Sequence, residues 1–222
     1  MARVTSTRRV PRAIREQQML DAAVTVFARR GYHAASMEEI ADAAGITKPM
    51  IYLYIGAKGD LFMACISREA ERLTAAILRE ADQELPAQEQ LWRALNAFFA
   101  AVAADRDAWN LVFRRSRHEG DTFAAAALAL RQQMIAISTG LLMRAAESGA
   151  RAATEDDLRA LSLAVVGACE ALADWVVDHP EADPQVTAAQ MMNLAWMGFD
   201  RLLAGERWRP ADRPVSQLDP AE

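Results

Sequence analysis

The chain has 222 residues, of which 52% are hydrophobic and 25% are charged, with a formal net charge of −5. This composition allows a substantial buried core in one large or two small domains. No run of about 18 uncharged apolar residues is evident, and the two cysteines, Cys65 and Cys169, lie far apart. Neither a membrane span nor a disulfide framework is therefore expected.

Charge is divided unevenly along the chain. Residues 1–58 hold nine Lys and Arg against five Asp and Glu, a net charge of +4, whereas residues 59–222 hold sixteen against twenty-five, a net charge of −9. The basic end can face phosphates while the acidic remainder stays in solvent. An N-terminal arginine arm either grips a nucleic-acid backbone or minor groove or is a solubilising tail; its members are Arg3, Arg8, Arg9, Arg12 and Arg15.

The first helix is expected over residues 12–30, with Gly31 ending it. Arg29 and Arg30 near its C-terminus suit the helix dipole. Its inward face is an apolar stripe at helical spacing, formed by Leu20, Ala23, Val24 and Phe27.

Two short helices joined by a tight turn are expected next. Ser36, with Glu39 three residues later, is a capping-box pattern that opens the first of them. Gly45 ends this helix as a C-cap glycine, Thr47 is a good N-cap for the second, and Pro49 fits its first turn. The buried face of the first short helix is formed by Met37, Ile40, Ala41 and Ala44.

The second short helix has two faces of different chemistry. Ile51 and Ile55, four residues apart, point inward. The only two lysines of the chain, Lys48 and Lys58, lie near the start of this helix and of the next, where cations can bind phosphates. The pattern fits a helix-turn-helix that reads DNA, and the alternative is a helical hairpin with ordinary exposed tyrosines. The outward side chains are Lys48, Met50, Tyr52 and Tyr54.

Over residues 12–66, apolar positions, glycines, caps and a lysine fall in one register. They are Met19-Leu20-Asp21-Ala22-Ala23, Phe27, Gly31-Tyr32, Ser36-Met37, Ile40-Ala41, Ala44-Gly45-Ile46-Thr47, Ile51-Tyr52, Lys58 and Leu61-Phe62. This run resembles the N-terminal domain of the tetracycline-repressor (TetR) family. The resemblance implies a DNA-binding surface formed by Ser36, Thr47, Lys48, Pro49, Met50, Tyr52, Tyr54 and Lys58.

Three positions depart from the usual family pattern. Tyr54 stands where the family commonly has histidine, Ala57 where it has serine or asparagine, and Gly59 where it has glutamate. The helix that starts at Lys58 therefore begins with a poor cap, which costs on the order of 1 kcal/mol. These departures leave open how rigidly Lys58 is held.

The rest of the chain shows helical patterns and no useful β alternation, so the predicted fold is all-α with about nine helices. Helices are expected over 60–84, 89–104, 105–120, 121–147, 154–179 and 184–205. The predicted organisation is a basic arm with a three-helix DNA-binding domain, then a helical ligand-binding and dimerisation domain, then a flexible tail. These parts cover residues 1–58, 59–205 and 206–222.

Small residues line one stripe of the helix expected over 154–179, and larger ones recur at matching intervals on the last helix. The resemblance implies that these two helices form a four-helix dimer interface, and the alternative is that they pack within one chain. The predicted dimer residues are Ala160, Ala164, Gly167, Ala171, Met192, Ala195 and Phe199. A dimer is also suited to reading a pseudo-palindrome, with half-sites roughly 34–36 Å apart.

Large flexible and aromatic side chains gather in the middle helices. Mainly because of the family resemblance, we expect a subset to line an apolar ligand cavity between helices, while a solid core is the alternative. The predicted pocket residues are Met63, Trp92, Phe99, Trp109, Phe113, Met134 and Trp175.

The sequence thus predicts a cytoplasmic transcriptional regulator that acts on double-stranded operator DNA as a homodimer. The expected form is a repressor released by a small apolar or amphipathic effector, and the alternative is a DNA-binding dimer without a ligand, acting as a nucleoid or partner-controlled factor. An enzyme is not expected, because His33, His118 and His179 lack metal-ligand spacing and no nucleophile motif or phosphate-cradling glycine loop is evident. No cofactor or metal is predicted.

Overall fold

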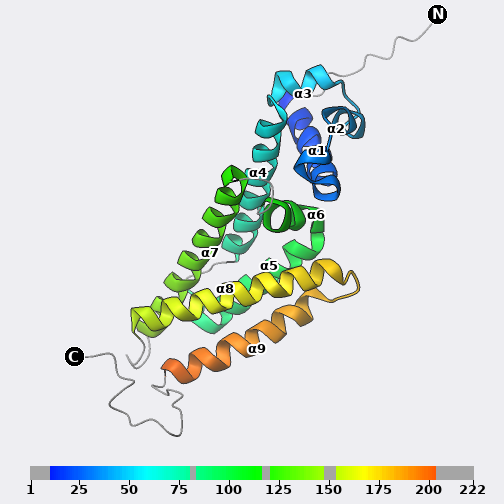
Figure 1. Cartoon of the computed structure of the whole chain (residues 1–222). Helices are drawn as coiled ribbons and strands as arrows, with labels where there is room; N and C mark the ends of the chain where they lie inside the picture. Colours follow the sequence, from blue (N-terminus) through cyan, green and yellow to red (C-terminus); the bar gives the residue numbers. More distant parts are fainter. Residues whose placement is uncertain (1–10, 81–83, 117–120, 148–153, 204–222) are drawn as a thin grey trace, which may run out of the picture.

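The computed structural model describes residues 11–80, 84–116, 121–147 and 154–203, and within these ranges the chain is helical without strands. The all-α prediction is confirmed. Figure 1 shows α1–α3 gathered at one end and α4 leading from them into the larger helical bundle. The helices are α1 Arg12–Ala34, α2 Met37–Ala43, α3 Lys48–Tyr54, α4 Lys58–Arg79, α5 Ala87–Ala104, α6 Arg106–Trp109, the π-helix η1 Asn110–Arg115, α7 Asp121–Glu147, α8 Glu155–Asp178 and α9 Pro184–Leu203.

The first hydrophobic core joins α1, α2 and α3 to the beginning of α4. Phe27, Ile40, Ile51 and Phe62 are each fully buried in it. Because this core continues along α4 as far as Ile66, the expected domain boundary at residue 58 falls at the start of a helix that both cores share.

The turn between α2 and α3 is built from local hydrogen bonds. Ser36 Oγ accepts from the Glu39 N–H at 3.0 Å, as the capping pattern predicted. At the other end of α2, Gly45 adopts a φ of 64°, and the Ile46 N–H donates to the Ala41 carbonyl at 3.0 Å. This left-handed glycine turns the chain so that α3 packs across α2.

The end of α1 differs from the prediction. The helix breaks at Gly31, which has a φ of 78°, but a further turn continues to Ala34. The Ala35 N–H closes this turn on the Gly31 carbonyl at 3.2 Å. Gly31 is thus a kink rather than a terminus, because glycine alone adopts this φ without a Cβ penalty.

The second core lies in the larger bundle, where α5 packs against α9 and α8, and α7 packs against α8. The single helix expected over residues 105–120 was wrong in detail. The chain forms the short α6 and then the π-helix η1, across which the rings of Trp109 and Phe113 stack at 4.0 Å. π-Turns inside helices are often found at functional sites.

Two of the described helices are nonetheless long and apolar. The segments Phe123–Met143 and Glu155–Asp178 are long and apolar enough to cross a membrane by length and composition. A search for uncharged runs does not find them, because each segment contains charged residues. Only 17% and 33% of these windows are buried within this chain, so much apolar surface remains on α7 and α8.

Candidate functional site

Helix α3 lies on the outside of the first core and is anchored by one fully buried residue, Ile51. On its outer face Tyr52 is 48% exposed and Leu53 is 77% exposed. Met50 and Tyr54 are half-buried at the edges of this face, and Pro49 is exposed in the first turn. The exposed face therefore combines a phenol hydroxyl with apolar surface, which suits base edges and thymine methyl groups.

Leu53 is a candidate contact that the sequence reasoning missed. It was not included in the inward face of Ile51 and Ile55, nor among the outward residues that the sequence analysis named. Its signal was available, because the residue lies two positions after the buried Ile51 and a helix turns through about 200° in that interval.

Lys48 lies at the N-terminus of α3 and forms an ion pair with Glu38 of α2. The hydrogen bond from Lys48 lowers the pKa of Glu38 and raises the pKa of Lys48. Both groups therefore stay charged near neutral pH. A DNA phosphate that binds Lys48 has to replace this carboxylate or share the ammonium with it.

Two hydroxyls beside α3 differ in their engagement. Thr47 occupies the N-cap position of α3 but makes no capping hydrogen bond with its side chain, contrary to its predicted role. Its exposed hydroxyl is left available for another acceptor or donor. Ser36 does cap α2, and because its oxygen accepts that bond, its hydroxyl proton can still be donated.

Lys58 and Tyr54 are both held by cation–π contacts within the subunit. The Lys58 ammonium donates to the His33 carbonyl at 3.1 Å and lies 4.9 Å from the centre of the Tyr32 ring. The Arg12 guanidinium lies 5.2 Å from the centre of the Tyr54 ring. These contacts hold the last residue of α3 and the first residue of α4 against α1. Lys58, a predicted phosphate contact, therefore also stabilises the packing of α4 on α1.

The predicted weakness at the start of α4 is partly compensated. Ala57 has no side-chain acceptor, but its own N–H donates to the Asp60 carboxylate at 2.8 Å. An acidic residue here also suits the positive end of the helix dipole. Asp60 was overlooked, although its place three residues after the N-cap is the signal of a capping box.

A small apolar cavity lies in the second core between α4, α5, α7 and α8, with a volume of about 100 Å³. Trp109, Phe113 and Met134 line it, so three of the predicted pocket residues meet there. Arg131 and Glu170 also line it and form an ion pair at 3.0 Å.

The other predicted pocket residues do not line this cavity. Phe99 is fully buried and Trp92 half-buried in the second core, where they serve as packing. Met63 packs against the first core instead. Trp175 is 44% exposed and stacks on His179, because its position on α8 turns it away from the bundle. The solid-core alternative therefore describes Phe99 and Trp92.

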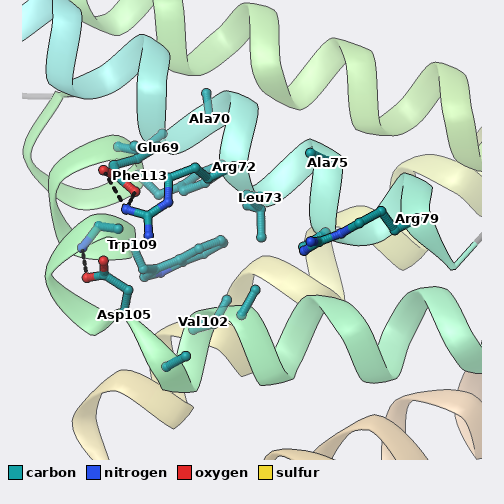
Figure 2. A pocket seen from close by; sticks show the side chains of 15 residues that line it. Glu69, Ala70, Arg72, Leu73, Ala75, Arg79, Val102, Asp105, Trp109 and Phe113 are labelled. Atoms are coloured by element: carbon teal, nitrogen blue, oxygen red, sulfur yellow. Dashed lines mark hydrogen bonds and ion pairs between the residues drawn. The ribbon is translucent and has the colours of Figure 1, made fainter. Parts of the chain in front are cut away.

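A larger cavity of about 460 Å³ lies beside the first, between α4, α5, α6 and η1. Figure 2 shows Arg72 and Arg79 extending from α4 into the space facing α5. Leu73, Trp109 and Phe113 line both cavities. These three side chains thus form a wall shared by the two cavities.

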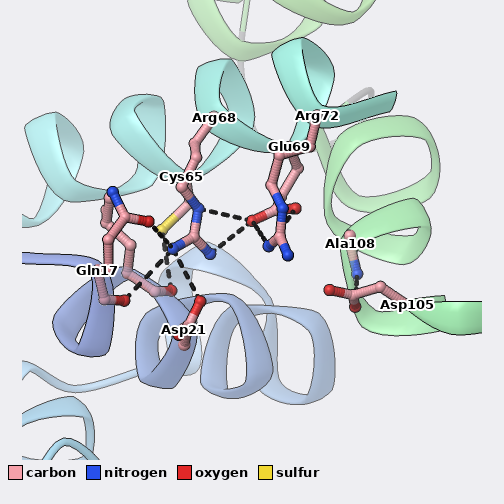
Figure 3. Close-up of polar contacts among 9 residues, drawn as sticks. Gln17, Asp21, Cys65, Arg68, Glu69, Arg72, Asp105 and Ala108 are labelled. Carbon is pink, nitrogen blue, oxygen red and sulfur yellow. Dashed lines mark hydrogen bonds and ion pairs between the residues drawn. The ribbon is translucent and has the colours of Figure 1, made fainter. Parts of the chain in front are cut away.

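Two arginines connect the cavity-lining elements to α1. Arg68 of α4 pairs with Asp21 at 2.8 Å and with the buried Glu69, to which its Nε donates at 2.7 Å (Figure 3). Arg115 of η1 donates to the carbonyls of Ala28 and Arg29 at 3.3 and 3.4 Å. Both α4 and η1, whose residues line the cavities, are thus bound to α1.

The predicted dimer stripe on α8 is mostly open. Ala160, Ala164 and Ala171 are exposed, whereas Gly167 is half-buried, and a Cβ there would lie 3.8 Å from Arg131 Nη2. On α9 the predicted face needs correction. Ala195 is buried in the second core and Met192 packs against it, because α9 turns this face toward α5.

The outward face of α9 carries different large apolar residues, with Leu194 67% and Met197 64% exposed. Phe199 lies in α9, but its side chain is outside the described residues. The arm residues Arg3, Arg8 and Arg9 and the expected tail are also outside them.

Comparisons with known proteins match this architecture at both ends. The model of bacterial regulatory proteins of the tetR family matches residues 19–65, and the tetracyclin repressor-like C-terminal domain matches residues 87–198. The chain belongs to the TetR family. It is therefore a transcriptional regulator with a helix-turn-helix DNA-binding domain, as the resemblance implied.

The relatives include both sequences and solved structures. A TetR-like transcriptional regulator from a Rhodococcus species is 40% identical, with a TM-score of 0.74 over 89% of this chain and 100% of that one. FadR from Bacillus subtilis, in complex with stearoyl-CoA, shares the fold at 20% identity, with a TM-score of 0.70 over 86% of this chain and 99% of that one.

The transcriptional activator FasR from Mycolicibacterium smegmatis is 37% identical over 105 residues, which are 47% of this chain and 48% of FasR. The match thus spans about half the length of this curated relative. TetR-type regulators bind DNA, and the FadR complex shows that a protein of this fold also holds a small-molecule ligand.

Proposed function

We propose that the chain represses transcription as a homodimer that occupies a pseudo-palindromic operator and leaves it when an amphipathic ligand binds. The observation that carries the DNA part is the exposed outer face of α3, with Tyr52 and Leu53 open to solvent on a helix fixed by the buried Ile51. Met50 and Tyr52 contact bases, while Thr47, Lys48 and Pro49 lie near phosphates.

The dimer rests on apolar surface that no helix of the same subunit covers. Leu163 and Trp175 are exposed on α8, and Leu194 and Met197 on α9. Because large exposed apolar surfaces often mark protein interfaces, these side chains support pairing through α8 and α9. Pairing through α8 and α9 places two α3 helices on one side of the dimer, where they read successive major grooves.

The ligand class follows from the two adjoining cavities and from the relatives. The apolar cavity of about 100 Å³ is smaller than the roughly 300–1,000 Å³ usual for ligand sites. An alkyl chain therefore has to push α7 and α8 apart as it enters. FadR was solved with stearoyl-CoA, which makes a fatty acyl thioester the first ligand to test.

Release depends on the difference in ligand affinity between two states of the dimer. Phe113 of η1 lines both cavities, and Arg115, two residues later, binds α1. Ligand entry displaces η1 and so alters the distance between the two α3 helices. A hundredfold preference of the ligand for the released state supplies about 2.7 kcal/mol.

The proposal is tested by selecting binding sites from random DNA with the purified chain, with and without stearoyl-CoA. The expected result is an enriched inverted repeat with half-site centres about one helical turn apart, which is lost when stearoyl-CoA is present. Enrichment that stearoyl-CoA and shorter acyl thioesters leave unchanged would support a DNA-binding dimer without such a ligand. Stronger enrichment with the ligand would mean that the ligand promotes DNA binding instead of release, and would favour an activator, which is how the relative FasR is described.

A further inference from the structure

The cavity between α4, α5 and α6 has a chemistry that an apolar effector alone does not explain. Its volume of about 460 Å³ lies in the range of small-molecule sites. Small side chains create the space, since alanines of three helices form much of its wall, among them Ala75, Ala101 and Ala108. Arg72 and Arg79 of α4 reach into this space (Figure 2).

Among the charged residues that line this cavity, Arg79 has the fewest interactions with other residues in the described part of the chain. Its side chain is solvent-exposed at the cavity wall, and it has no hydrogen bond or ion pair with any residue in the described part of the chain. A guanidinium has five N–H donors and binds carboxylates and phosphates in a bidentate manner. An anionic group in the cavity would give these donors a partner.

Arg72 can join the same site at low cost. Its Nη1 reaches Glu69 only at 3.3 and 3.4 Å, and its side chain is 59% exposed. Glu69 does not depend on it, because Arg68 donates to the same carboxylate at 2.7 Å. Arg72 can therefore turn toward an anion without leaving the Glu69 carboxylate unpaired.

The two carboxylates of the cavity are already engaged and do not exclude an anion. Glu69 is buried between Arg68 and Arg72. Asp105 caps α6 by accepting from the Ala108 N–H at 2.9 Å. The cations with unused donors are thus Arg72 and Arg79, among the residues that line the cavity.

We infer that this cavity is an anion subsite, in which Arg72 and Arg79 bind the carboxylate or phosphate of a ligand whose apolar part enters the adjoining cavity. Leu73, Trp109 and Phe113 form the shared wall, so a ligand that occupies both cavities has to displace these side chains. The inference rests on the proposed function for the apolar part, whereas the anion subsite can be tested separately.

Four probes separate the contributions in calorimetric titrations of the full chain: dodecan-1-ol, dodecanoate, dodecanoyl-CoA and coenzyme A without an acyl chain. The anionic dodecyl probes are expected to bind at least about ten-fold more tightly than dodecan-1-ol. Arg79→Gln removes this advantage and leaves the affinity for dodecan-1-ol unchanged. If only dodecanoyl-CoA shows the effect, the bound anion is phosphate; if dodecanoate shows it too, a carboxylate suffices.

Arg93→Gln is the matched control, because Arg93 is an arginine of α5 that pairs with Glu89 and does not line the cavity. It is expected to leave all four affinities unchanged. Arg72→Gln provides a second variant, with a loss of the same sign as that of Arg79→Gln.

The outcomes distinguish this inference from the proposed function. Equal affinities for dodecan-1-ol and both anionic dodecyl probes, or equal losses in Arg79→Gln and Arg93→Gln, would overturn the subsite and leave the apolar cavity intact. Binding of coenzyme A that depends on Arg79, with no binding of dodecan-1-ol, would keep the subsite and overturn the apolar site. No binding by any probe would overturn both.

Discussion

The ion pair between Lys48 and Glu38 is a single contact that is expected to affect how tightly the protein binds DNA. In the structure Lys48 already has an anionic partner on α2. Both side chains are solvent-exposed in part, so the pair contributes little to folding. If Lys48 contacts DNA as proposed, a phosphate and the Glu38 carboxylate compete for the same ammonium.

Lys48→Ala and Glu38→Gln are therefore expected to change operator affinity in opposite directions. Lys48→Ala removes a phosphate contact, which weakens binding and lowers the slope of log K against log salt by about one. Glu38→Gln removes the competing charge and strengthens binding. Titrations of labelled operator over a range of salt concentrations measure both effects.

An unchanged affinity and slope in Lys48→Ala would remove Lys48 from the DNA contacts. Weaker binding in Glu38→Gln would mean that Glu38 positions Lys48 rather than competing for it. Glu155→Gln, at the start of α8, is a control far along the chain for the loss of one carboxylate.

Alanine substitutions at Gly45 and Gly59 test how the backbone of the α2–α3 turn and of the start of α4 contributes to stability. A Cβ at Gly45 meets no atom within 4 Å, but φ is +64°, so Gly45→Ala costs about 1–2 kcal/mol through backbone strain alone. Gly59 is helical, and a Cβ there lies 3.5 Å from the Tyr32 hydroxyl. Gly59→Ala is expected to stabilise by about 0.5–1 kcal/mol. Urea denaturation measures both, and a Gly45→Ala variant as stable as the unaltered chain would contradict the strain.

Helix α4 connects the two functions because it belongs to both cores. Phe62 and Cys65 are buried in the first core, while Ala70 and Leu73 pack against the second. Burial raises the pKa of the Cys65 thiol to about 12, so this cysteine acts as a packing residue rather than a thiolate. Arg68, between the two cores, holds α1 through Asp21 and Gln17.

Arg68→Gln is expected to uncouple ligand binding from DNA release. The variant loses the ion pairs with Asp21 and Glu69, so displacement of α4 no longer reaches α1 with the same force. Stearoyl-CoA affinity should stay within about two-fold, while the ratio of operator affinities without and with ligand falls at least about five-fold. The two affinities are measured separately, by calorimetry and by operator titration.

Asp21→Asn gives an independent version of this test, because it removes the α1 partner and keeps Arg68 bound to Glu69. An unchanged ratio in both variants would assign the coupling to Arg115 and η1 instead. A large loss of ligand affinity would show that Arg68 supports the cavity itself.

In the proposed complex the whole molecule presents its N-terminal end to DNA and the α8–α9 face to its partner. Apolar residues remain exposed on both of these helices, including Leu163 and Leu194. The acidic charge of residues 59–222 keeps most of the surface away from DNA phosphates. Only the N-terminal end, with its positive net charge, is then attracted to the duplex.

Leu194→Glu is expected to weaken self-association at least about ten-fold, because it places a charge in a desolvated interface. Operator affinity should fall with it, since one α3 reads a single half-site. Analytical ultracentrifugation and operator titration measure the two effects. Leu78→Glu changes an exposed leucine on α4 and is the matched control; equal effects of the two variants would argue against an α8–α9 interface.

The sequence by itself determined the helical class, the helix-turn-helix and its caps, because these depend on local spacing. Ser36, Gly45 and Ile51 are examples, since periodicity and φ preference act within a few residues. It also placed Trp109, Phe113 and Met134 among the candidate pocket residues, which the structure brings together around one cavity. The π-helix η1 and the exposure of Leu53 were not predicted, because the local sequence indicates them less clearly than it indicates caps and helical periodicity.

Only the tertiary structure decided which face of each helix turns inward. Ala195 and Trp175 illustrate this, since helical spacing defines a stripe but not the neighbour that covers it, and α9 packs on α5 while Trp175 faces outward. The same holds for Arg68, Arg72 and Arg79, three arginines of one helix. Arg68 pairs with Asp21, Arg72 pairs with Glu69, and Arg79 lines the cavity. These roles differ because α1 and α5, which are far apart in the sequence, lie beside different parts of α4.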